Sequence, residues 1–549
     1  MRRFLTFLWK SSMSSRKRIR FVAVVVFVCV AIATSVAVGT AVAEDARVVE
    51  AYPDTYQTDD AGEYVAVEFE TTNTTGWTLG DGEDETVLPN ETLDDTVYFA
   101  AEGAPEDKDD YALELRLANS GEVITLRNES GKTVDEIRYG DESGVTPDEG
   151  EILFRVGDAA TALKTRHIGA TDFGVLRTNV SGVTAFALPD APGTVTEEFR
   201  DADERVLVSA FTFGSQHLAD VLRDTEADIS ILVESTPPGG FGVPTERVLN
   251  SLADAADVYV ADGERRRYRF LHAKYAVVDN TAVVTSENWG DRNFAPDATG
   301  SRGWGVVVED EESANYLARV FREDVDWRAV PSWENASFES YEADESDAEV
   351  RTGFDAIETD EAEVELFVTP DESVQPVVSL IESADDEILV QQSYIRSWSD
   401  ENLSTNPYVA ALEERVEDGV DVRVLLDSRW YYEEENAEVA GALNASGIDA
   451  RLAAYPVHTK GVVVDGESVL VSSINWNENS PKNNREVGVV VHDEKVAGYF
   501  ADVFETDWNA GTDEDEQGDA DATPTDYALE IVIIIVVSGI GIWLVRREI

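Results

Sequence analysis

Two stretches of the chain carry the same spaced trio of a histidine, a lysine and an aspartate. The members are His272, Lys274 and Asp279 in HAKYAVVD, and His458, Lys460 and Asp465 in HTKGVVVD. The chain has only five histidines among its 549 residues, so two matching trios point to a shared chemical task. Near neutral pH a histidine can attack as a nucleophile or carry a proton, and an ammonium group can hold anionic oxygens. The trio therefore suits chemistry at a phosphate.

A polar pair follows each trio at matching offsets. The pairs are Ser286 and Asn288 in TSENW, and Ser473 and Asn475 in SSINW. Apolar residues flank the short turn between trio and pair, which predicts a hairpin that returns the pair beside the trio. On such a strand the histidine and the lysine, two residues apart, point to the same face. We expect the two pairs to bind or orient a substrate phosphate.

The duplication itself has a chemical reason. One copy supplies one histidine, whereas displacement at a phosphodiester through a covalent intermediate needs a nucleophile and a proton donor for the leaving oxygen. Two copies that face each other across a pseudo-twofold axis supply both groups. Asp279 and Asp465 stand where each strand meets its turn, a position where aspartate is often a turn former, so we count them with the catalytic trios as structural supports.

The pattern His-x-Lys-x4-Asp followed by Ser-x-Asn resembles the signature of the phospholipase D superfamily. The resemblance spans about 192–510 and occurs twice. It implies a phosphohistidine intermediate, with no metal and no other cofactor. By analogy with the family, we expect His272 to be the nucleophile and His458 the general acid.

The two copies depart from that signature in different ways. Thr285 and Ser472 stand where the family has glycine. The stretch NNREVGVVV carries Glu486 after the second trio, and SRGWGVVV places Gly303 at the matching position of the first. We expect Glu486 to orient and polarise His458, and His272 to lack such a helper.

Aromatic and basic residues lie at other predicted strand ends near the site. They are Phe211 and Phe213 in SAFTF, and Tyr394 and Arg396 in QQSYIRSW. We expect them to line the cleft without acting as catalytic groups.

Strands alternate with helical patterns over 192–345, and the same order recurs over 351–510, which predicts two α/β lobes with mixed sheets. Residues 44–141 show short alternating runs broken by turns, typical of an antiparallel β-sandwich. Their stretches GWTLGDG and LANSGE resemble the lamin-tail domain, an immunoglobulin-like module, which implies a binding or spacing role with an unknown protein partner. Residues 142–191 are either further strands or a connecting region.

Both ends of the chain carry apolar stretches. Residues 1–43 have a basic start and an apolar run ending in Ala-Val-Ala, which indicates a signal peptide or an uncleaved signal anchor. The acidic stretch 511–526 reads as a linker. Residues 527–545 are apolar and precede Arg546 and Arg547, which predicts a C-terminal transmembrane helix with the catalytic part outside the cell membrane.

The composition limits the alternatives. There are 43 Lys and Arg against 110 Asp and Glu, a formal net charge of −67, yet 43% of residues are hydrophobic, so a folded acidic protein of a salt-rich, halophilic setting is expected. The single cysteine excludes a disulfide within one chain. The sequence has no P-loop, Cys-x-x-Cys or His-Glu-x-x-His motif, so nothing in it supports a nucleotide-driven or zinc-dependent enzyme.

These observations predict an exported, membrane-anchored phosphodiesterase of phospholipase D type with phospholipid as the favoured substrate. An extracellular nuclease of the same superfamily is the first alternative. The second is a cell-surface binding protein whose catalytic pair has decayed.

Overall fold

The computed structural model describes residues 46–510. Short gaps fall at 58–60, 105–107, 141–142, 236, 238–240, 262–266, 328–331, 334–339, 342–349, 351, 400–401 and 430. The predicted signal segment, acidic linker and C-terminal transmembrane helix lie outside the described residues. Within those described residues, no helix has the length and apolarity needed to cross a membrane. The chain divides into two compact units, one up to Arg166 and one from His167.

The N-terminal unit is a β-sandwich of two sheets around one core. The six-stranded sheet has the order β10-β9-β1-β2-β5-β6 and the other the order β4-β3-β7-β8. Their bounds are β1 (Ala46–Tyr52), β2 (Tyr64–Asn73), β3 (Thr78–Gly80), β4 (Glu85–Val87), β5 (Thr92–Ala100), β6 (Tyr111–Ala112), β7 (Val123–Arg127), β8 (Thr133–Arg138), β9 (Glu151–Arg155) and β10 (Leu163–His167). Inward-facing residues of both sheets, such as Val65, Val67, Ile124 and Leu126, form the core. The strands continue past the predicted boundary at 141, and an immunoglobulin-like or lamin-tail topology stays a prediction.

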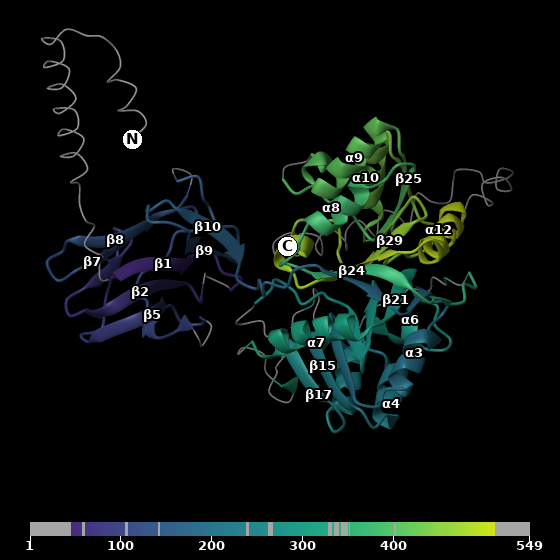
Figure 1. Cartoon of the computed structure of the whole chain (residues 1–549), viewed down its shortest axis with the longest axis horizontal. Coiled ribbons are helices and arrows are strands. Elements are labelled where there is room, and N and C mark those ends of the chain that lie inside the picture. The colour runs from purple at the N-terminus through teal and green to yellow at the C-terminus, as the bar shows by residue number, and fades with distance from the viewer. Residues whose placement is uncertain are drawn as a thin grey trace, which may run out of the picture. The chain divides into compact units, whose positions relative to one another are not determined.

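The second unit holds two eight-stranded mixed sheets of identical topology, which confirms the prediction of two α/β lobes (Figure 1). Lobe 1 has the order β17-β15-β13-β18-β19-β21-β12-β23, and lobe 2 has β27-β26-β25-β28-β29-β30-β24-β11. In each, three parallel strands continue into five antiparallel ones. The lobe 1 strands are β12 (Val183–Leu188), β13 (Arg205–Ala210), β15 (Asp228–Glu234), β17 (Asp257–Ala261), β18 (Tyr275–Val278), β19 (Thr281–Thr285), β21 (Gly303–Glu309) and β23 (Ile357–Thr359). The lobe 2 strands are β11 (Leu176–Val180), β24 (Ala362–Val368), β25 (Glu387–Gln392), β26 (Asp421–Leu426), β27 (Asp449–Leu452), β28 (Lys460–Val464), β29 (Ser468–Ser472) and β30 (Val487–His492).

The lobes exchange edge strands. β11 pairs with β24 of lobe 2 although it precedes lobe 1 in sequence, and β23 pairs with β12 of lobe 1 although it lies within the predicted range of lobe 2. The segment 142–191, which the sequence left undecided, therefore forms strands that build both sheets and the N-terminal unit.

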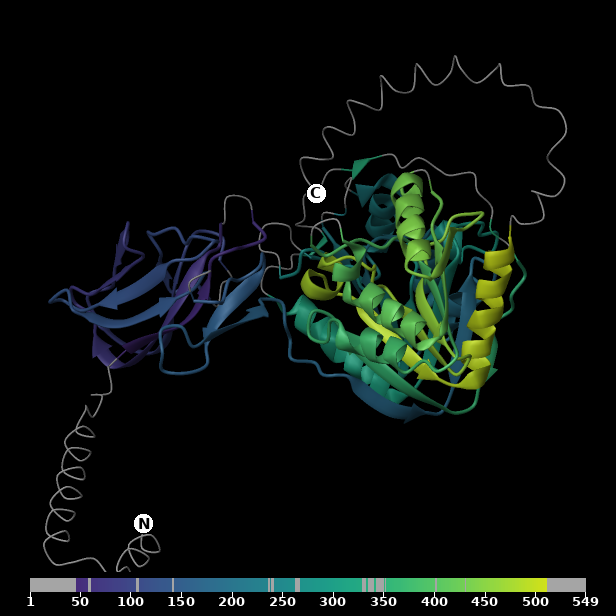
Figure 2. The same ribbon diagram turned by 90° about the horizontal axis from the view of Figure 1, so that it is seen from above.

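Helices cover the outer faces of the two sheets, and two more lie between the lobes. Helices α3 (Gly193–Arg200), α4 (Gln216–Asp224), α5 (Val243–Leu252) and α6 (Asp291–Phe294) belong to lobe 1; α8 (Gln375–Glu382), α9 (Pro407–Asp418), α10 (Glu433–Ala445), α11 (Asn479–Asn483) and the 3₁₀ turn η4 (Leu403–Thr405) belong to lobe 2. Short parallel ribbons pair β14 (Phe213–Gly214) with β20 (Trp289–Gly290), and β16 (Phe241–Gly242) with β22 (Ser340–Tyr341). Figure 2 shows α12 (Glu494–Asn509) and the green helices on opposite sides of the lobe 2 sheet.

Helices α7 (Glu311–Val325) and α12 end the two lobes in the same way. Each begins with an aspartate N-cap: Asp310 accepts the Ser313 amide at 2.7 Å, and Asp493 accepts the Val496 amide at 2.9 Å. α7 packs on its own sheet and on β11, while α12 packs on its own sheet and on β12 and β23. One apolar core thus runs through both lobes and fixes their relation.

Candidate active site

The two histidine motifs meet at the interface between the lobes. His272 lies just before β18, and its amide donates to the carbonyl of Arg485 in lobe 2 at 2.9 Å. His458 lies just before β28, and its amide donates to the carbonyl of Arg302 in lobe 1 at 2.8 Å. Each histidine is therefore held by backbone of the opposite lobe.

A carboxylate of the opposite lobe also holds each imidazole. His272 Nδ1 lies 2.8 Å from Glu486 Oε2, and His458 Nδ1 lies 3.2 Å from Glu287 Oε2. The prediction that Glu486 orients His458 is wrong, as is the prediction that His272 has no helper. The cause is the crossed packing of the lobes, which carries Glu486 to the first motif. In both rings Nε2 makes no protein hydrogen bond among the described residues.

Glu486 is held firmly as an anion. Its carboxylate accepts hydrogen bonds from Ser473 Oγ at 2.6 Å, Ser480 Oγ at 2.8 Å and Asn484 Nδ2 at 3.1 Å. Burial alone would raise the pKa of this fully buried carboxyl, but His272, the charge of Lys274 and the Ser473 hydrogen bond together outweigh burial and lower the pKa. Ser473, predicted to bind or orient phosphate, thus orients the carboxylate that holds His272.

Glu287 is held less firmly. Among the described residues its one hydroxyl donor is Ser301 Oγ at 2.9 Å, and Glu287 is 3% exposed. Burial raises the pKa of Glu287 to about 7, against the lowering effect of Lys460 and of the Ser301 hydrogen bond. The two imidazoles therefore pair with carboxyl groups whose pKa values are shifted in opposite directions, lowered for Glu486 and raised for Glu287.

The two motif lysines are fully buried beside the histidines. Lys274 Nζ donates to the His272 carbonyl at 2.7 Å, and Lys460 Nζ donates to the His458 carbonyl and to Ser393 Oγ, the latter at 3.2 Å. Burial lowers the pKa of Lys274 to about 7 and that of Lys460 well below its usual value, the latter with a further contribution from Lys274.

The imidazoles respond in the same direction. Burial lowers the pKa of His272 to about 4, and burial together with the nearby charges of Lys460, Arg429, Lys274 and His272 lowers the pKa of His458 well below its usual value. These groups repel one another when protonated in a poorly solvated place. A phosphate anion between them would relieve the repulsion and raise every one of these pKa values.

The predicted polar pairs divide into two roles. The amide oxygens Oδ1 of Asn288 and Asn475 are buried and have no hydrogen-bond partner among the described residues. An amide oxygen accepts hydrogen bonds, so these two atoms suit a hydroxyl or water donor and not an anionic phosphate oxygen. Ser286 Oγ accepts the amide of Trp304 at 3.0 Å and is fully buried, so it holds the backbone that follows Gly303.

Asp279 and Asp465 lie at the far ends of the motif strands from the histidines. Asp279 accepts the amides of Asp203, Glu204 and Arg205 at 2.8–2.9 Å, and Asp465 accepts those of Asp385, Asp386 and Glu387 at 2.8 Å. Both have positive φ, 51° and 52°, in the turn that begins each hairpin. They anchor the starts of β13 and β25, and neither is placed to contact the reacting phosphate.

Buried arginine clusters join the lobes directly behind the site. Arg302 Nε lies 2.9 Å from Asp507 on α12 of lobe 2, and Arg485 Nη2 lies 2.8 Å from Asp324 on α7 of lobe 1. Each arginine also pairs with a second aspartate at 2.9 Å, Asp190 for Arg302 and Asp371 for Arg485. Sequence reasoning did not identify these clusters, because their partners are far apart in the chain.

The four residues that we expected to line the cleft lie in different surroundings. Phe211 stands against the His272 ring, with centroids 4.8 Å apart in a T-shaped arrangement, and Lys274 Nζ lies 5.3 Å from its ring centre. Phe213 is buried in the core of lobe 1. The Tyr394 hydroxyl accepts Asn477 Nδ2 at 2.6 Å, and Arg396 pairs with Glu435.

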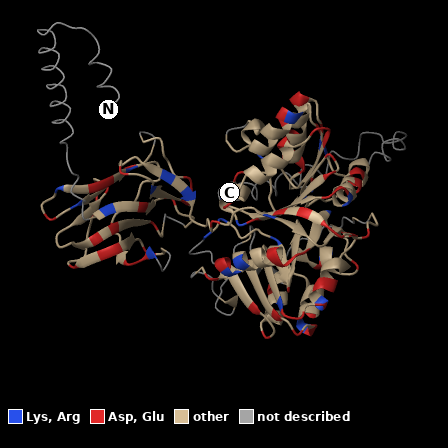
Figure 3. Ribbon diagram, in the orientation of Figure 1, with Lys and Arg blue, Asp and Glu red and all other residues tan. Residues whose placement is uncertain are grey.

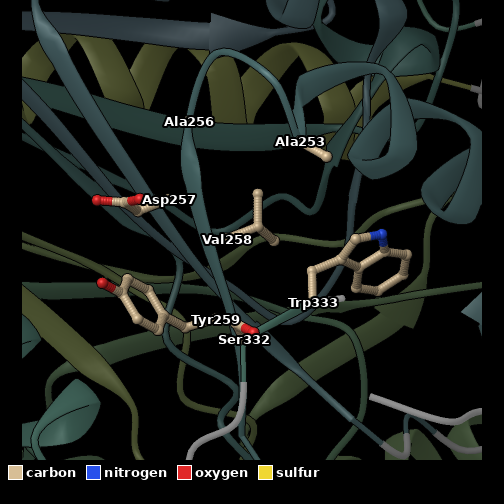
Figure 4. A pocket seen from close by; sticks show the side chains of 7 residues that line it. All are labelled: Ala253, Ala256, Asp257, Val258, Tyr259, Ser332 and Trp333. Carbon is tan, nitrogen blue, oxygen red and sulfur yellow. The ribbon is translucent and has the colours of Figure 1, made fainter. Parts of the chain in front are cut away.

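A separate cavity of about 290 Å³ lies at the β17 edge of lobe 1 (Figure 4). Its lining consists of Ala253, Ala256, Asp257, Val258, Tyr259, Ser332 and Trp333. None of these belongs to the two motifs, so the cavity lies outside the reaction site. No cluster of three or more metal-ligating side chains is found among the residues that the structure describes.

Sequence reasoning also missed Glu287, although a signal was present. It is the middle residue of Ser-x-Asn, where the second copy has the apolar Ile474. A carboxylate at an apolar position, in the copy that carries Gly303 in place of Glu486, indicates that the carboxylate has moved.

Two matching lobes contribute one histidine and one lysine each to a shared site, which defines a duplicated two-lobe protein with a single histidine–lysine centre. The chain matches the family model described as cardiolipin synthase, PLD-like domain, over residues 195–325 and again over 377–508. It belongs to the phospholipase D superfamily.

Similar proteins share parts of this chain. Mitochondrial cardiolipin hydrolase of Homo sapiens is 33% identical over 92 residues, 16% of this chain and 36% of that protein, and that of Canis lupus familiaris is 33% identical over 93 residues, 16% and 35%. The match covers about a third of the length of these curated relatives. Among solved structures, phosphatidylserine synthase of Haemophilus influenzae Rd KW20 is 13% identical, with 60% of this chain and 85% of that chain covered and a TM-score of 0.42. Nuc, a phospholipase D family member from Salmonella typhimurium, is 24% identical, with 27% and 95% covered and a TM-score of 0.24.

Proposed function

We propose that this protein cleaves or transfers phosphodiesters through a phosphohistidine intermediate and that its substrate is a phospholipid. One observation carries the proposal. Two imidazoles from opposite lobes each have Nδ1 fixed by a carboxylate, 2.8 Å for His272 and 3.2 Å for His458, with a buried lysine beside each ring. This arrangement leaves both Nε2 atoms for a phosphate.

His272 is the proposed nucleophile because its partner Glu486 has a lowered pKa and is ionised at neutral pH, whereas burial raises the pKa of Glu287, the partner of His458, to about 7. A fixed carboxylate at Nδ1 holds the tautomer in which Nε2 has a free lone pair. Nε2 of His272 forms a bond to phosphorus, the bond from phosphorus to the leaving oxygen breaks, and His458, which enters as the imidazolium beside the bound phosphate, gives its Nε2 proton to that oxygen and keeps its Nδ1–H on Glu287. Lys274 and Lys460 stabilise the charge on the non-bridging oxygens.

The second half of the reaction reverses the proton movement. Water, or an acceptor alcohol in the case of transfer, gives a proton to His458 Nε2 while its oxygen bonds to phosphorus. The bond from phosphorus to His272 Nε2 then breaks and the site returns to its starting state. Whether water or an alcohol enters decides between hydrolysis and transfer.

Several observations favour a phospholipid over the two alternatives. The curated relatives are named as cardiolipin hydrolases. A nucleic-acid substrate favours a basic track along several phosphates, whereas Lys and Arg are scattered among Asp and Glu on the described chain (Figure 3). A decayed binding protein would not need both carboxylates, and both histidines have one.

The setting of the enzyme is a further part of the proposal. The basic and apolar residues 1–43 and the apolar residues 527–545 support export and a C-terminal anchor at the cell membrane, with the catalytic unit outside. An anchor would hold the site near lipid head groups. Protease digestion of intact cells tests this, because an outward-facing catalytic unit is cleaved without lysis.

The activity is tested with the full-length protein in mixed lipid micelles at molar salt. Phospholipids, an aryl phosphodiester, and single- and double-stranded DNA are offered in parallel to the wild type, His272→Ala and His458→Ala. Lipid turnover abolished by each substitution supports the proposal. DNA cleavage with inert lipid supports the nuclease, and phosphate binding without any turnover supports the binding protein.

A further inference from the structure

The carboxylate that holds His458 comes from an unexpected position of lobe 1. The lobes align through a shared contact: the Ser473 amide donates to the Val487 carbonyl at 2.9 Å, and the Ser286 amide donates to the Trp304 carbonyl at 3.0 Å. Gly303 therefore occupies in lobe 1 the place that Glu486 occupies in lobe 2. Glu287, in turn, corresponds to Ile474, which is buried in the apolar core of lobe 2.

Glu287 fills the space that the missing side chain leaves. A Cβ added to Gly303 would lie 2.2 Å from Glu287 Cγ and 2.8 Å from its Oε1, distances that no real side chain tolerates. In lobe 1, a glutamate at position 287 can therefore take its place only if position 303 has no side chain. The Glu287 carboxylate contacts Nδ1 of His458, just as the Glu486 carboxylate contacts Nδ1 of His272.

We propose that Glu287 is the positioning residue of His458, and that Gly303 is required because it gives the relocated carboxylate its space. This inference rests on the proposed function for its kinetic test. Glu287 holds the Nδ1–H of His458 so that Nε2–H points at the leaving oxygen. It acts through His458 and does not touch the phosphate.

The role predicts a dependence on the leaving group. A general acid matters for an alkyl diester, whose leaving alkoxide is strongly basic, and matters little for a p-nitrophenyl diester, whose leaving group departs without a proton. In Glu287→Gln we expect kcat/KM to fall about 100-fold for the alkyl diester and roughly threefold at most for the aryl diester. Glu486→Gln is the matched control, and it should slow both substrates because it acts on the nucleophile.

Moving the carboxylate back to position 303 tests whether Glu287 and a side chain at 303 compete for the same space. Gly303→Glu alone should abolish turnover of the alkyl diester, because two side chains compete for one space. Glu287→Ala alone should lose it as well. The double variant, Glu287→Ala with Gly303→Glu, should recover at least tenfold over either single change. Failure of the folded double variant to recover, together with equal loss on both substrates in Glu287→Gln, would overturn the inference.

A spectroscopic measurement keeps the test independent of turnover. In full-length protein with ¹⁵N-labelled histidine, the Nδ1–H proton of His458 is assigned by its loss in His458→Ala. In alkaline buffer it should appear far downfield in the wild type and move upfield in Glu287→Gln, with the His272 signal unchanged. An unmoved His458 signal refutes the role of Glu287. Absence of cleavage by the wild type with a moved signal refutes the proposed function alone.

Discussion

Replacing Asp324 by asparagine tests whether the buried arginine clusters hold the two lobes in their working arrangement. Asp324 on α7 is 3% exposed and accepts Arg485 Nε at 3.0 Å, Arg485 Nη2 at 2.8 Å and the Tyr268 hydroxyl at 2.8 Å. Arg485 itself is fully buried, so its charge has no access to water. The substitution keeps the shape and removes one of the two balancing charges.

The expected loss of stability depends on how well Asp371, the second partner, still balances the charge of Arg485. Breaking a buried ion pair costs about 3–5 kcal/mol when the other charge is left uncompensated. Here Asp371 still lies 2.9 Å from Arg485, so the lower end, about 3 kcal/mol, is expected for Asp324→Asn. Removing both carboxylates should cost about 5 kcal/mol or more. For a cooperative unit of about 340 residues, 3 kcal/mol lowers Tm by roughly 4 °C.

Calorimetry of the full-length protein in molar salt measures this shift. The matched control is Glu365→Gln, which breaks the partly exposed pair Arg177–Glu365 at 3.0 Å between β11 and β24 and the 3.7 Å contact of Glu365 with His492. An exposed pair contributes about 0–1 kcal/mol, so the control should move Tm by no more than about 1 °C. Equal, small shifts for Asp324→Asn and Glu365→Gln would show that the clusters do not hold the lobes together.

Three further predictions concern the site. For an alkyl diester, kcat/KM should rise as Glu287 ionises with a pKa of about 7, and fall as His458, whose pKa is lowered, and Lys274, with a pKa of about 7, lose their protons; a pH profile of Glu287→Gln should lack only the acid limb. Phosphate should raise Tm and bind with proton uptake at neutral pH, because it raises the lowered lysine and histidine pKa values; titration calorimetry in two buffers of different ionisation enthalpy measures the uptake. Phe211→Ser, which copies Ser393 of lobe 2, should lower kcat/KM about tenfold for an aryl diester by freeing the His272 ring, and an unchanged value would refute that role.

Local patterns in the sequence were enough to predict the two lobes and the meeting of their motifs. The strands β18 and β28 and their returning hairpins follow directly from HAKYAVVD and HTKGVVVD, because buried strands are read from apolar runs and turns. The repeat of the whole pattern predicts two copies of one fold. What a pattern cannot give is how two copies pack against each other.

The wrong partner predicted for Glu486 has that origin. Glu486 follows the second motif in sequence, so it was assigned to the second histidine, but crossed packing brings it to the first. The edge strands β11 and β23 likewise join the sheet of the lobe to which they do not belong in sequence. Ser286, predicted to bind or orient the phosphate, accepts the amide of Trp304 within its own lobe, a contact that the motif alone does not give.

Crossed packing makes each lobe dependent on the other for a working histidine. In lobe 2 a single dipeptide supplies three constraints: Arg485 provides the ion pair to α7 and the carbonyl for the His272 amide, and Glu486 provides the carboxylate for the ring. In lobe 1 the corresponding dipeptide supplies only the first two, through Arg302, because Gly303 has no side chain. The third constraint comes from a different loop. The carboxylate contact to His458 can therefore change without disturbing the contacts that join the lobes. Such independence allows the two duplicated histidines to take different roles.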